Sequence, residues 1–139
     1  MTNDILQFGY LMERCMRTMI SRLSDNLASA GIALPYSQYE VMRVLYRDGN
    51  RSQIHIAHAL QKDAAAIKRS IDSLESKGFV NRREVSGREN IVELTPKGES
   101  IKTTVIGIAE QTINDILAPI STEHRRIVMD TLEAICHQK

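Results

Sequence analysis

The chain has 139 residues, of which 42% are hydrophobic and 25% are charged. This composition is close to that of an average soluble globular protein, and it excludes a disordered chain, a collagen-like fibre and a disulfide scaffold. The 18 basic and 17 acidic residues give a net charge of +1, which over the whole chain argues against an indiscriminate nucleic-acid binder.

Several functional classes find no support in the sequence. No apolar stretch approaches the roughly 18 residues of a membrane span, and we expect no signal peptide. Cys15 and Cys136 stand far apart and form no metal-ligand spacing, so a reduced, cytoplasmic setting is expected. The phosphate-loop, HExxH and GxSxG motifs are absent from the sequence. We therefore expect neither an enzyme nor a bound metal or cofactor.

The first element in chain order is a long amphipathic helix over residues 4–30. Gly31 supplies its stop, because glycine tolerates the left-handed conformation that ends many helices. Its apolar residues recur every three or four positions: Ile5, Phe8, Met12, Cys15, Met16, Met19, Leu23 and Leu27.

A second helix is predicted to begin at Ser37, which forms a capping box with Glu40, and to end near Gly49. A short helix then follows Ser52. Its inward-facing residues are expected to be Ile54, Ala57 and Leu60.

Asp63 is a suitable cap for a third helix, which is expected to run through Lys77 and to end at Gly78. The apolar stripe of this helix consists of Ile67, Ile71 and Leu74. The opposite, polar face carries Ala65, Lys68, Arg69, Asp72, Ser73 and Ser76.

The pattern then changes to that of a β-hairpin. Residues 79–83 and 90–94 are short segments with β-branched or aromatic side chains, and the polar residues 84–89 between them contain one glycine.

Two further helices are predicted to complete the chain. Thr95 caps the first, Pro96 takes its first position, and it is expected to run without interruption to about Leu117. The last runs from Thr122 to about His137. The expected inner faces are Ile101, Val105, Ile108, Thr112, Ile116 and Ile120 in the first helix, and Ile127, Val128, Leu132 and Ile135 in the second.

The order of these elements predicts a mainly α protein with a small β-hairpin wing, that is, a winged helix-turn-helix. The helix over residues 64–77 would be the one that enters the major groove of DNA. We expect an N-terminal dimerisation helix and connector over residues 1–34, a DNA-binding domain over residues 35–98, and C-terminal dimerisation helices over residues 99–139.

The terminal helices carry more apolar surface than a small winged helix can cover. A homodimer in which these helices interdigitate would bury it, and its two-fold symmetry would match a palindromic operator. The alternative is a monomer in which the terminal helices fold over the core.

Two stretches of the sequence resemble the multiple-antibiotic-resistance regulator (MarR) family. Residues 67–82 are similar to the family's recognition helix and its "L-E-x-x-G" turn into the wing, and residues 91–98 to its "L-T-x-x-G" motif. The resemblance implies a dimeric winged-helix protein, usually a repressor, that a small ligand or oxidation often releases from DNA. At positions 86–88 the acidic residue common in the family's wing is missing, although Arg88 can act as the wing-tip arginine.

The candidate DNA contacts lie on the third helix of this unit and on the wing. Arginine pairs well with guanine, small residues allow close approach to the groove, and wing arginines enter the minor groove or bind phosphates. The alternatives are a solvated helix face and, for the two strand arginines, an ion pair to Glu84 or packing against the body. The candidates are Ala65, Ala66, Lys68, Arg69, Ser73, Arg82, Arg83, Arg88 and Asn90.

Other polar and sulfur-containing residues have mainly structural interpretations. Ser37 and Ser52 could offer groups to phosphate, but helix capping already explains both. Cys15 invites a redox-sensing interpretation, although its place on the apolar stripe indicates a buried residue, and Cys136 is expected to be packed. Methionines could line a deformable pocket for a small apolar or aromatic effector between the terminal helices and the DNA-binding unit.

The sequence therefore predicts a dimeric, double-stranded-DNA-binding transcriptional regulator, and the resemblance implies that it is a repressor. The main alternative is a winged-helix module that binds another protein. The charge distribution favours DNA, because residues 35–98 hold 11 basic and 8 acidic residues, a net of +3, whereas residues 99–139 hold 4 and 6, a net of −2.

Overall fold

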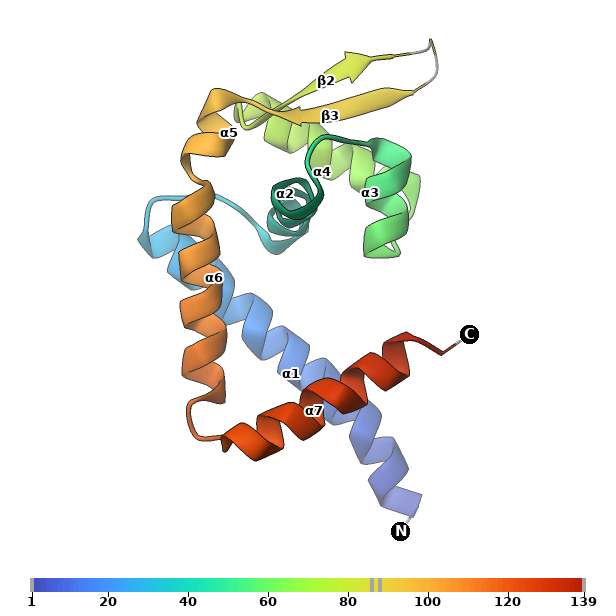
Figure 1. The fold of residues 1–139 in the computed structure, drawn as a ribbon, viewed down its shortest axis with the longest axis vertical. Coiled ribbons are helices and arrows are strands. Elements are labelled where there is room, and N and C mark those ends of the chain that lie inside the picture. The colour runs from blue at the N-terminus through green and yellow to red at the C-terminus, as the bar shows by residue number, and fades with distance from the viewer. Residues whose placement is uncertain (1, 86, 88, 139) are drawn as a thin grey trace.

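The computed structural model describes residues 2–85, 87 and 89–138, and it is mainly α-helical with a small antiparallel sheet (Figure 1). This agrees with the predicted fold class. The elements are α1 (Thr2–Ser29), α2 (Tyr36–Asp48), β1 (Arg51–Ser52), α3 (Gln53–Leu60), α4 (Ala64–Ser76), β2 (Val80–Glu84), β3 (Asn90–Leu94), α5 (Pro96–Ser100), α6 (Lys102–Leu117) and α7 (Thr122–Cys136).

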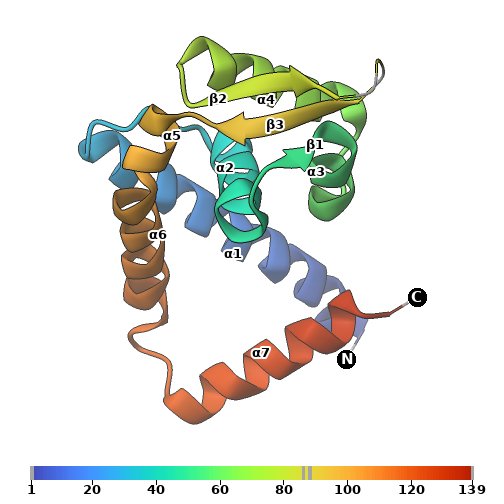
Figure 2. The same cartoon turned by 45° about the horizontal axis from the view of Figure 1, so that its top comes forward.

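The core lies where α2, α3 and α4 pack together beneath the sheet (Figure 2). Burial of apolar side chains is the main stabilising contribution here. Each of the three helices and the two longer strands contributes to it, and the fully buried residues of this part are Val41, Met42, Val44, Leu45, Ile56, Ile67, Ile71, Leu74, Val80 and Val92.

The sheet has the strand order β1-β3-β2, with both pairs antiparallel. The predicted hairpin is confirmed, and its register places Arg82 opposite Val92. Strand β1 was not predicted, because its two residues are too short to form a pattern. Ile54, next to this strand, is 72% exposed, so its predicted inward position is wrong; Ile56 is the buried isoleucine of α3.

Helix α2 does not begin with the predicted capping box. It starts at Tyr36, one residue earlier, and Pro35 occupies the cap position without any side-chain cap bond. The backbone carbonyl of Pro35 accepts hydrogen bonds from the amides of Gln38 and Tyr39. The Glu40 side chain is buried and pairs with Lys62 instead of turning back to the helix start.

The long helix predicted after Thr95 is interrupted at Ile101. Thr95 does cap α5, where its side chain accepts from the amide of Gly98, but α6 begins only at Lys102. The break lets α5 stay against the sheet while α6 runs along α1 (Figure 1). Gly98 permits this close packing, since a Cβ there would lie 2.2 Å from the Phe79 carbonyl oxygen.

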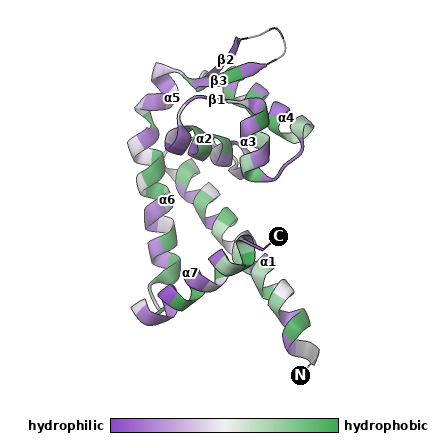
Figure 3. Cartoon of the chain, turned by 45° about the vertical axis from the view of Figure 1, so that its right-hand side comes forward, coloured by the Kyte–Doolittle hydropathy of each residue, from purple (hydrophilic) through white to green (hydrophobic). Residues whose placement is uncertain are grey.

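The terminal helices are less buried than the sequence predicted. Helix α1 packs against α6, with a 2.8 Å hydrogen bond from Asn26 Nδ2 to Thr112 Oγ1, and Val105 and Thr112 are buried as expected. Helix α7, however, contains no buried residue in the single chain, so the expected burial of its apolar face is not seen within one chain. Hydrophobic residues colour parts of both α7 and α1 green in Figure 3, and several of them are exposed in the single chain.

No helix among the described residues is both long and apolar enough to cross a membrane.

Candidate nucleic-acid interface

Helix α4 has one buried face and one polar face, as its sequence predicts. The Asp63 carboxylate caps the helix by accepting from the Ala66 amide at 2.8 Å. Ile67, Ile71 and Leu74 are fully buried, which fixes the rotation of the helix about its axis. The opposite side is therefore directed away from the core, and Ala65, Lys68, Arg69 and Asp72 are all exposed on it.

The polar side of α4 has two edges with different surroundings. The edge beside the sheet carries Lys68, Asp72 and Glu75, which belong to a network of ion pairs with β2. We call this the wing edge. The other edge carries Arg69 and Ser73 and lies beside the start of α2. We call it the α2 edge.

Arg82 of β2 is the centre of the network on the wing edge. Its guanidinium donates to Asp72 Oδ1 at 2.6 Å, to Glu75 Oε1 at 2.9 Å and to Gln53 Oε1 at 2.6 Å. Its backbone amide also donates to Glu75 Oε2 at 3.1 Å. The side chain is only 16% exposed, so its donors are directed to protein acceptors and not to the surface. Of the two interpretations from the sequence, packing back on the body describes Arg82, with α4 carboxylates as partners in place of Glu84.

Asp72 divides its carboxylate between two cations. Lys68 Nζ lies 3.1 Å from Oδ2, while Arg82 binds Oδ1. These hydrogen bonds, first that of Lys68 and then that of Arg82, hold the pKa of Asp72 below its usual value. Lys68 is exposed, so it can exchange this partner for another anion at little cost.

The remaining wing candidates lie on β2 and β3. Arg83 is 58% exposed and pairs with Glu93 of β3, not with Glu84. Asn90 begins β3, opposite Glu84, and is partly buried. The predicted wing-tip residue Arg88 lies outside the described residues.

A polar cavity of about 260 Å³ opens on the α2 edge. It is bounded by side chains from α2, from α4 and from the turn that precedes α4. Within the described part of the chain, no acidic side chain pairs with Arg69. The lining residues are Ser37, Gln38, Lys62, Ala66, Arg69, Ser70 and Ser73.

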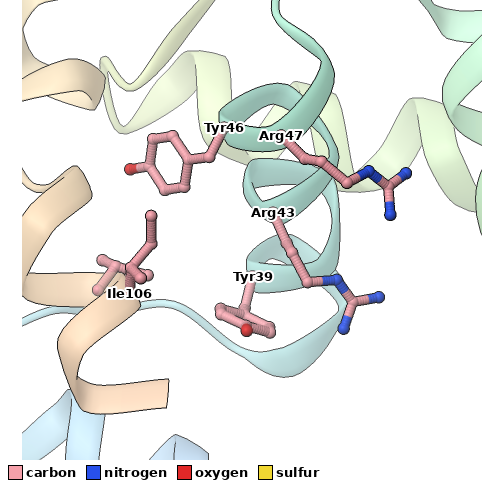
Figure 4. Close-up of a pocket in the computed structure, with 6 residues that line it drawn as sticks. Tyr39, Arg43, Tyr46, Arg47 and Ile106 are labelled. Carbon is pink, nitrogen blue, oxygen red and sulfur yellow. The ribbon is translucent and has the colours of Figure 1, made fainter. Parts of the chain in front are cut away.

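An apolar cavity of about 400 Å³ lies between the terminal helices and α2. Met16 and Met19 line it, as the sequence suggested for the methionines, together with Leu23, Tyr36, Tyr39, Arg43, Ala109, Thr112 and Ile113. A smaller cavity, which shares Tyr39 and Arg43 with the first, is lined by the residues in Figure 4. The Arg43 guanidinium lies 5.7 Å from the centroid of the Tyr39 ring. Burial raises the pKa of the Tyr39 hydroxyl, and the neighbouring Arg43 partly opposes this.

The cysteines are more accessible than predicted. Cys15 and Cys136 are both exposed in the single chain, because each lies on a terminal helix whose outer face has no cover within one chain. Among the described residues, no group of three or more His, Cys, Asp or Glu side chains is placed to hold a metal ion.

Comparisons with known proteins agree with this architecture. Residues 34–86 match the model of the MarR family. The helix-turn-helix-type transcriptional regulator YdgJ of Bacillus subtilis is 33% identical over 98 residues, which span 69% of this chain and 60% of that protein. The chain thus matches less than two thirds of the length of this relative.

Solved structures share the fold over nearly the whole chain. The transcriptional regulator BldR of Sulfolobus solfataricus superposes with a TM-score of 0.81 at 23% identity, covering 97% of this chain and 96% of that one. BpsR of Bordetella bronchiseptica superposes with a TM-score of 0.83 at 19% identity, covering 94% and 93%. The part of the chain from α2 to the end of β2 is thus similar to the MarR family, and the solved structures share the fold of nearly the whole chain.

Proposed function

We propose that this protein is a transcriptional regulator that binds double-stranded DNA in a sequence-specific manner. The observation that carries the proposal is the exposed polar side of α4, with Lys68 and Arg69, directly beside the β2–β3 hairpin. In winged helix-turn-helix proteins a helix so placed enters the major groove and the hairpin lies beside it on the DNA. The regulators among its relatives support the same role.

The predicted DNA contacts take different roles in this proposal. Lys68, Arg69 and Ser73, with the small residues Ala65 and Ala66, form the surface of α4 that faces the groove. Arg83, Arg88 and Asn90 are proposed to contact the duplex from the wing. We assign Arg82 a positioning role, because its guanidinium is already bound to Asp72, Glu75 and Gln53.

The active form is proposed to be a homodimer joined through its terminal helices, with residues 1–34 and 99–139 as dimerisation segments and residues 35–98 as the DNA-binding domain. The support is the apolar surface that one chain leaves uncovered, since large exposed apolar patches mark interaction sites. It includes Ile5, Leu6, Phe8, Leu11, Met12 and Met16 of α1, and Ile127, Val128, Met129 and Ile135 of α7. A two-fold dimer would present two α4 helices to a palindromic operator.

A small organic anion with an apolar or aromatic body is the proposed effector. The cavity beside Tyr39 is mainly apolar, and Arg43 adds a positive charge to its wall. The structure of BpsR concerns regulation of its DNA binding by 6-hydroxynicotinic acid, which has this chemistry. We propose that such a ligand changes the angle between α1, α6 and α2, and so releases a repressor from its operator.

A binding titration tests this function. The full chain is titrated with duplex from the region upstream of its own gene and with a random-sequence duplex, at several salt concentrations. We expect tighter binding to the upstream duplex than to the random one. For both duplexes, the logarithm of the binding constant should fall linearly with the logarithm of the salt concentration. If neither duplex is bound in a salt-dependent manner, the proposal is wrong and the protein-binding alternative takes its place.

A further inference from the structure

We propose that the polar cavity on the α2 edge binds a backbone phosphate of the DNA, and that Arg69 is one of its ligands and does not read a base. The inference rests on the proposed DNA binding and assigns a particular chemical group to this site. It departs from the expectation that Arg69, as an arginine on the helix that enters the groove, pairs with guanine.

The first support is the charge around the cavity. Lys62 and Arg69 both line it. Lys62 is paired with the buried carboxylate of Glu40, so Arg69 supplies the positive charge in excess. Lys77 adds a second cation behind the wall, where its Nζ donates to Gln38 Oε1 at 2.6 Å and so fixes that side chain. A site with a small positive excess suits the single negative charge of a phosphodiester.

The second support is a hydroxyl of a largely buried residue that has no partner within the described part of the chain. Ser70 is only 9% exposed and lines the cavity. In other helices of this chain a hydroxyl donates to the carbonyl four residues earlier, as Thr112 does to Ile108 at 2.7 Å. The Ser70 hydroxyl makes no such bond, and no other partner for it exists among the described residues. The hydroxyl is therefore free to bind a ligand that enters the cavity.

The third support comes from the start of α2. Because Pro35 takes the cap position with no side-chain cap bond, the amides of Tyr36 and Ser37 lack an acceptor within the described part of the chain. The positive end of the helix dipole is directed to the same side. Ser37 belongs to the cavity wall, together with Arg69, Ser70 and Ser73 of α4.

The two edges of α4 then have separate tasks. On the wing edge the acidic side chains Asp72 and Glu75 would repel a phosphate, and they already hold Lys68 and Arg82. Near the α2 edge the Glu40 carboxylate is paired with Lys62, and the Asp63 carboxylate caps α4 by accepting from the Ala66 amide. A phosphate held there would set the depth and rotation of α4 in the groove, because phosphate contacts fix the register of a protein on the duplex.

The test compares Arg69→Ala with the matched control Arg22→Ala, which removes an equal charge from an exposed position on α1. Binding of the full chain to the upstream and the random duplex is measured against salt concentration. For Arg69→Ala we expect both duplexes to bind more weakly by a similar factor, with the log–log salt slope smaller by about 0.9 per subunit, which is one phosphate contact. Arg69→Lys should keep the slope, and Arg22→Ala should keep both affinity and slope.

A second measurement locates the phosphate. Neutral methylphosphonates are introduced singly along the upstream duplex, and each is tested with wild type and with Arg69→Ala. We expect one position per half-site at which the neutral group weakens the wild type but not the variant. Ser73→Asp, which places a carboxylate in the cavity, should weaken binding to both duplexes. As a second, independent variant it keeps the test valid if Arg69→Ala fails to fold.

Two results would overturn the inference. If Arg69→Ala weakens only the upstream duplex and leaves the random duplex and its salt slope unchanged, Arg69 reads a base. If Arg69→Ala and Ser73→Asp both bind like wild type, the cavity holds no phosphate. Either result leaves DNA binding by the wild type intact, so failure of this inference is distinct from failure of the proposed function.

Discussion

Arg82 Nη2 lies 2.6 Å from Asp72 Oδ1, which joins the wing strand β2 directly to the exposed side of α4. The same guanidinium also binds Glu75 and Gln53. A single side chain thus connects α3, α4 and β2, and so joins the helix proposed to enter the groove to the wing. This connection adds to the hydrophobic core, to which Ile56, Ile71 and Val80 of the same three elements contribute.

Replacing Arg82 with methionine should therefore loosen the wing. Methionine keeps much of the apolar stem but leaves Asp72 and Glu75 without their cation. Because several charge-assisted hydrogen bonds are lost from a partly buried site, we expect the free energy of unfolding to fall by about 1–3 kcal/mol in urea titrations. Amide hydrogen exchange in β2 should accelerate as well.

Arg83→Met is the matched control for this prediction. Arg83 is the next residue of the same strand and pairs with Glu93 on the surface, where an ion pair contributes only about 0–1 kcal/mol. Equal losses of stability from the two variants would contradict the assigned role of Arg82.

Two glycine substitutions should have opposite effects. In Gly98→Ala the new Cβ would lie 2.2 Å from the Phe79 carbonyl oxygen, which is backbone and cannot move aside alone, so we expect a loss of about 2–3 kcal/mol. In Gly107→Ala the Cβ meets nothing within 4 Å, and the better helix propensity of alanine should add up to about 1 kcal/mol. Urea unfolding at one fixed protein concentration measures both, and a tolerated Gly98→Ala would argue against the close α5–β2 packing.

Lys62→Met should destabilise the protein, because the buried Glu40 carboxylate loses the cation with which it is paired. Without the Lys62 ammonium, the buried carboxylate of Glu40 has no compensating charge. We expect the free energy of unfolding to fall by about 1–3 kcal/mol, a moderate loss because Lys62 itself is partly exposed. Adding Glu40→Gln to this variant should recover part of the loss, since no buried charge then remains. The surface pair Arg47–Asp48 offers a control, and Arg47→Met should cost less than 1 kcal/mol.

The stability of the protein should fall in alkali partly through Tyr46. Burial, followed by the nearby charge of Glu99, raises the pKa of Tyr46 from its ordinary value of 10.0 to about 12. A group with a raised folded pKa contributes stability that is complete below pH 10 and is lost as the pH rises towards 12. Tyr46→Phe should flatten this alkaline decline in urea midpoints measured between pH 9 and 12.

The same variant has a second expected effect at neutral pH. It loses the 2.8 Å hydrogen bond from the Tyr46 hydroxyl to the Gly98 carbonyl, at a cost of about 1 kcal/mol. An alkaline profile identical to that of wild type would show that another group causes the decline.

Val128→Asp should separate the proposed dimer. Val128 is half exposed on the apolar face of α7, and an aspartate there would be desolvated on association. Sedimentation should give a monomer for this variant and a dimer for wild type. Arg126→Asp introduces the same side chain on the opposite side of α7 and should remain dimeric; a monomeric wild type would refute the dimer.

The elements whose ends depend on local chemistry could be predicted from the sequence. Asp63, Ser52 and Thr95 cap their helices as expected, and the α4 stripe of Ile67, Ile71 and Leu74 is buried. The predictions were wrong where the structure is determined by contacts between residues that are far apart in the sequence. The apolar period continues through Ile101, so the local sequence does not predict the break between α5 and α6. The packing of α5 on the sheet requires that break.

The candidate site was harder to predict for the same reason. The polar side of α4 follows from its period, but the partners of Arg82 come from α3 and α4, and no spacing rule along the chain places Gln53 and Asp72 beside it. The Ser70 hydroxyl likewise becomes part of a candidate site only because residues of α2 complete the cavity that Ser70 lines. A serine in a helix gives no such signal in the sequence.

The placement of α7 far from the wing (Figure 1) has an electrostatic consequence. The net charge of +3 in residues 35–98 and of −2 in residues 99–139 gives the molecule an electric dipole along its length. In the field of a polyanion such a dipole turns its positive end forward before contact. Molecules that approach the duplex are therefore already oriented with α4 and the wing leading, so fewer encounters fail because the protein arrives in the wrong orientation.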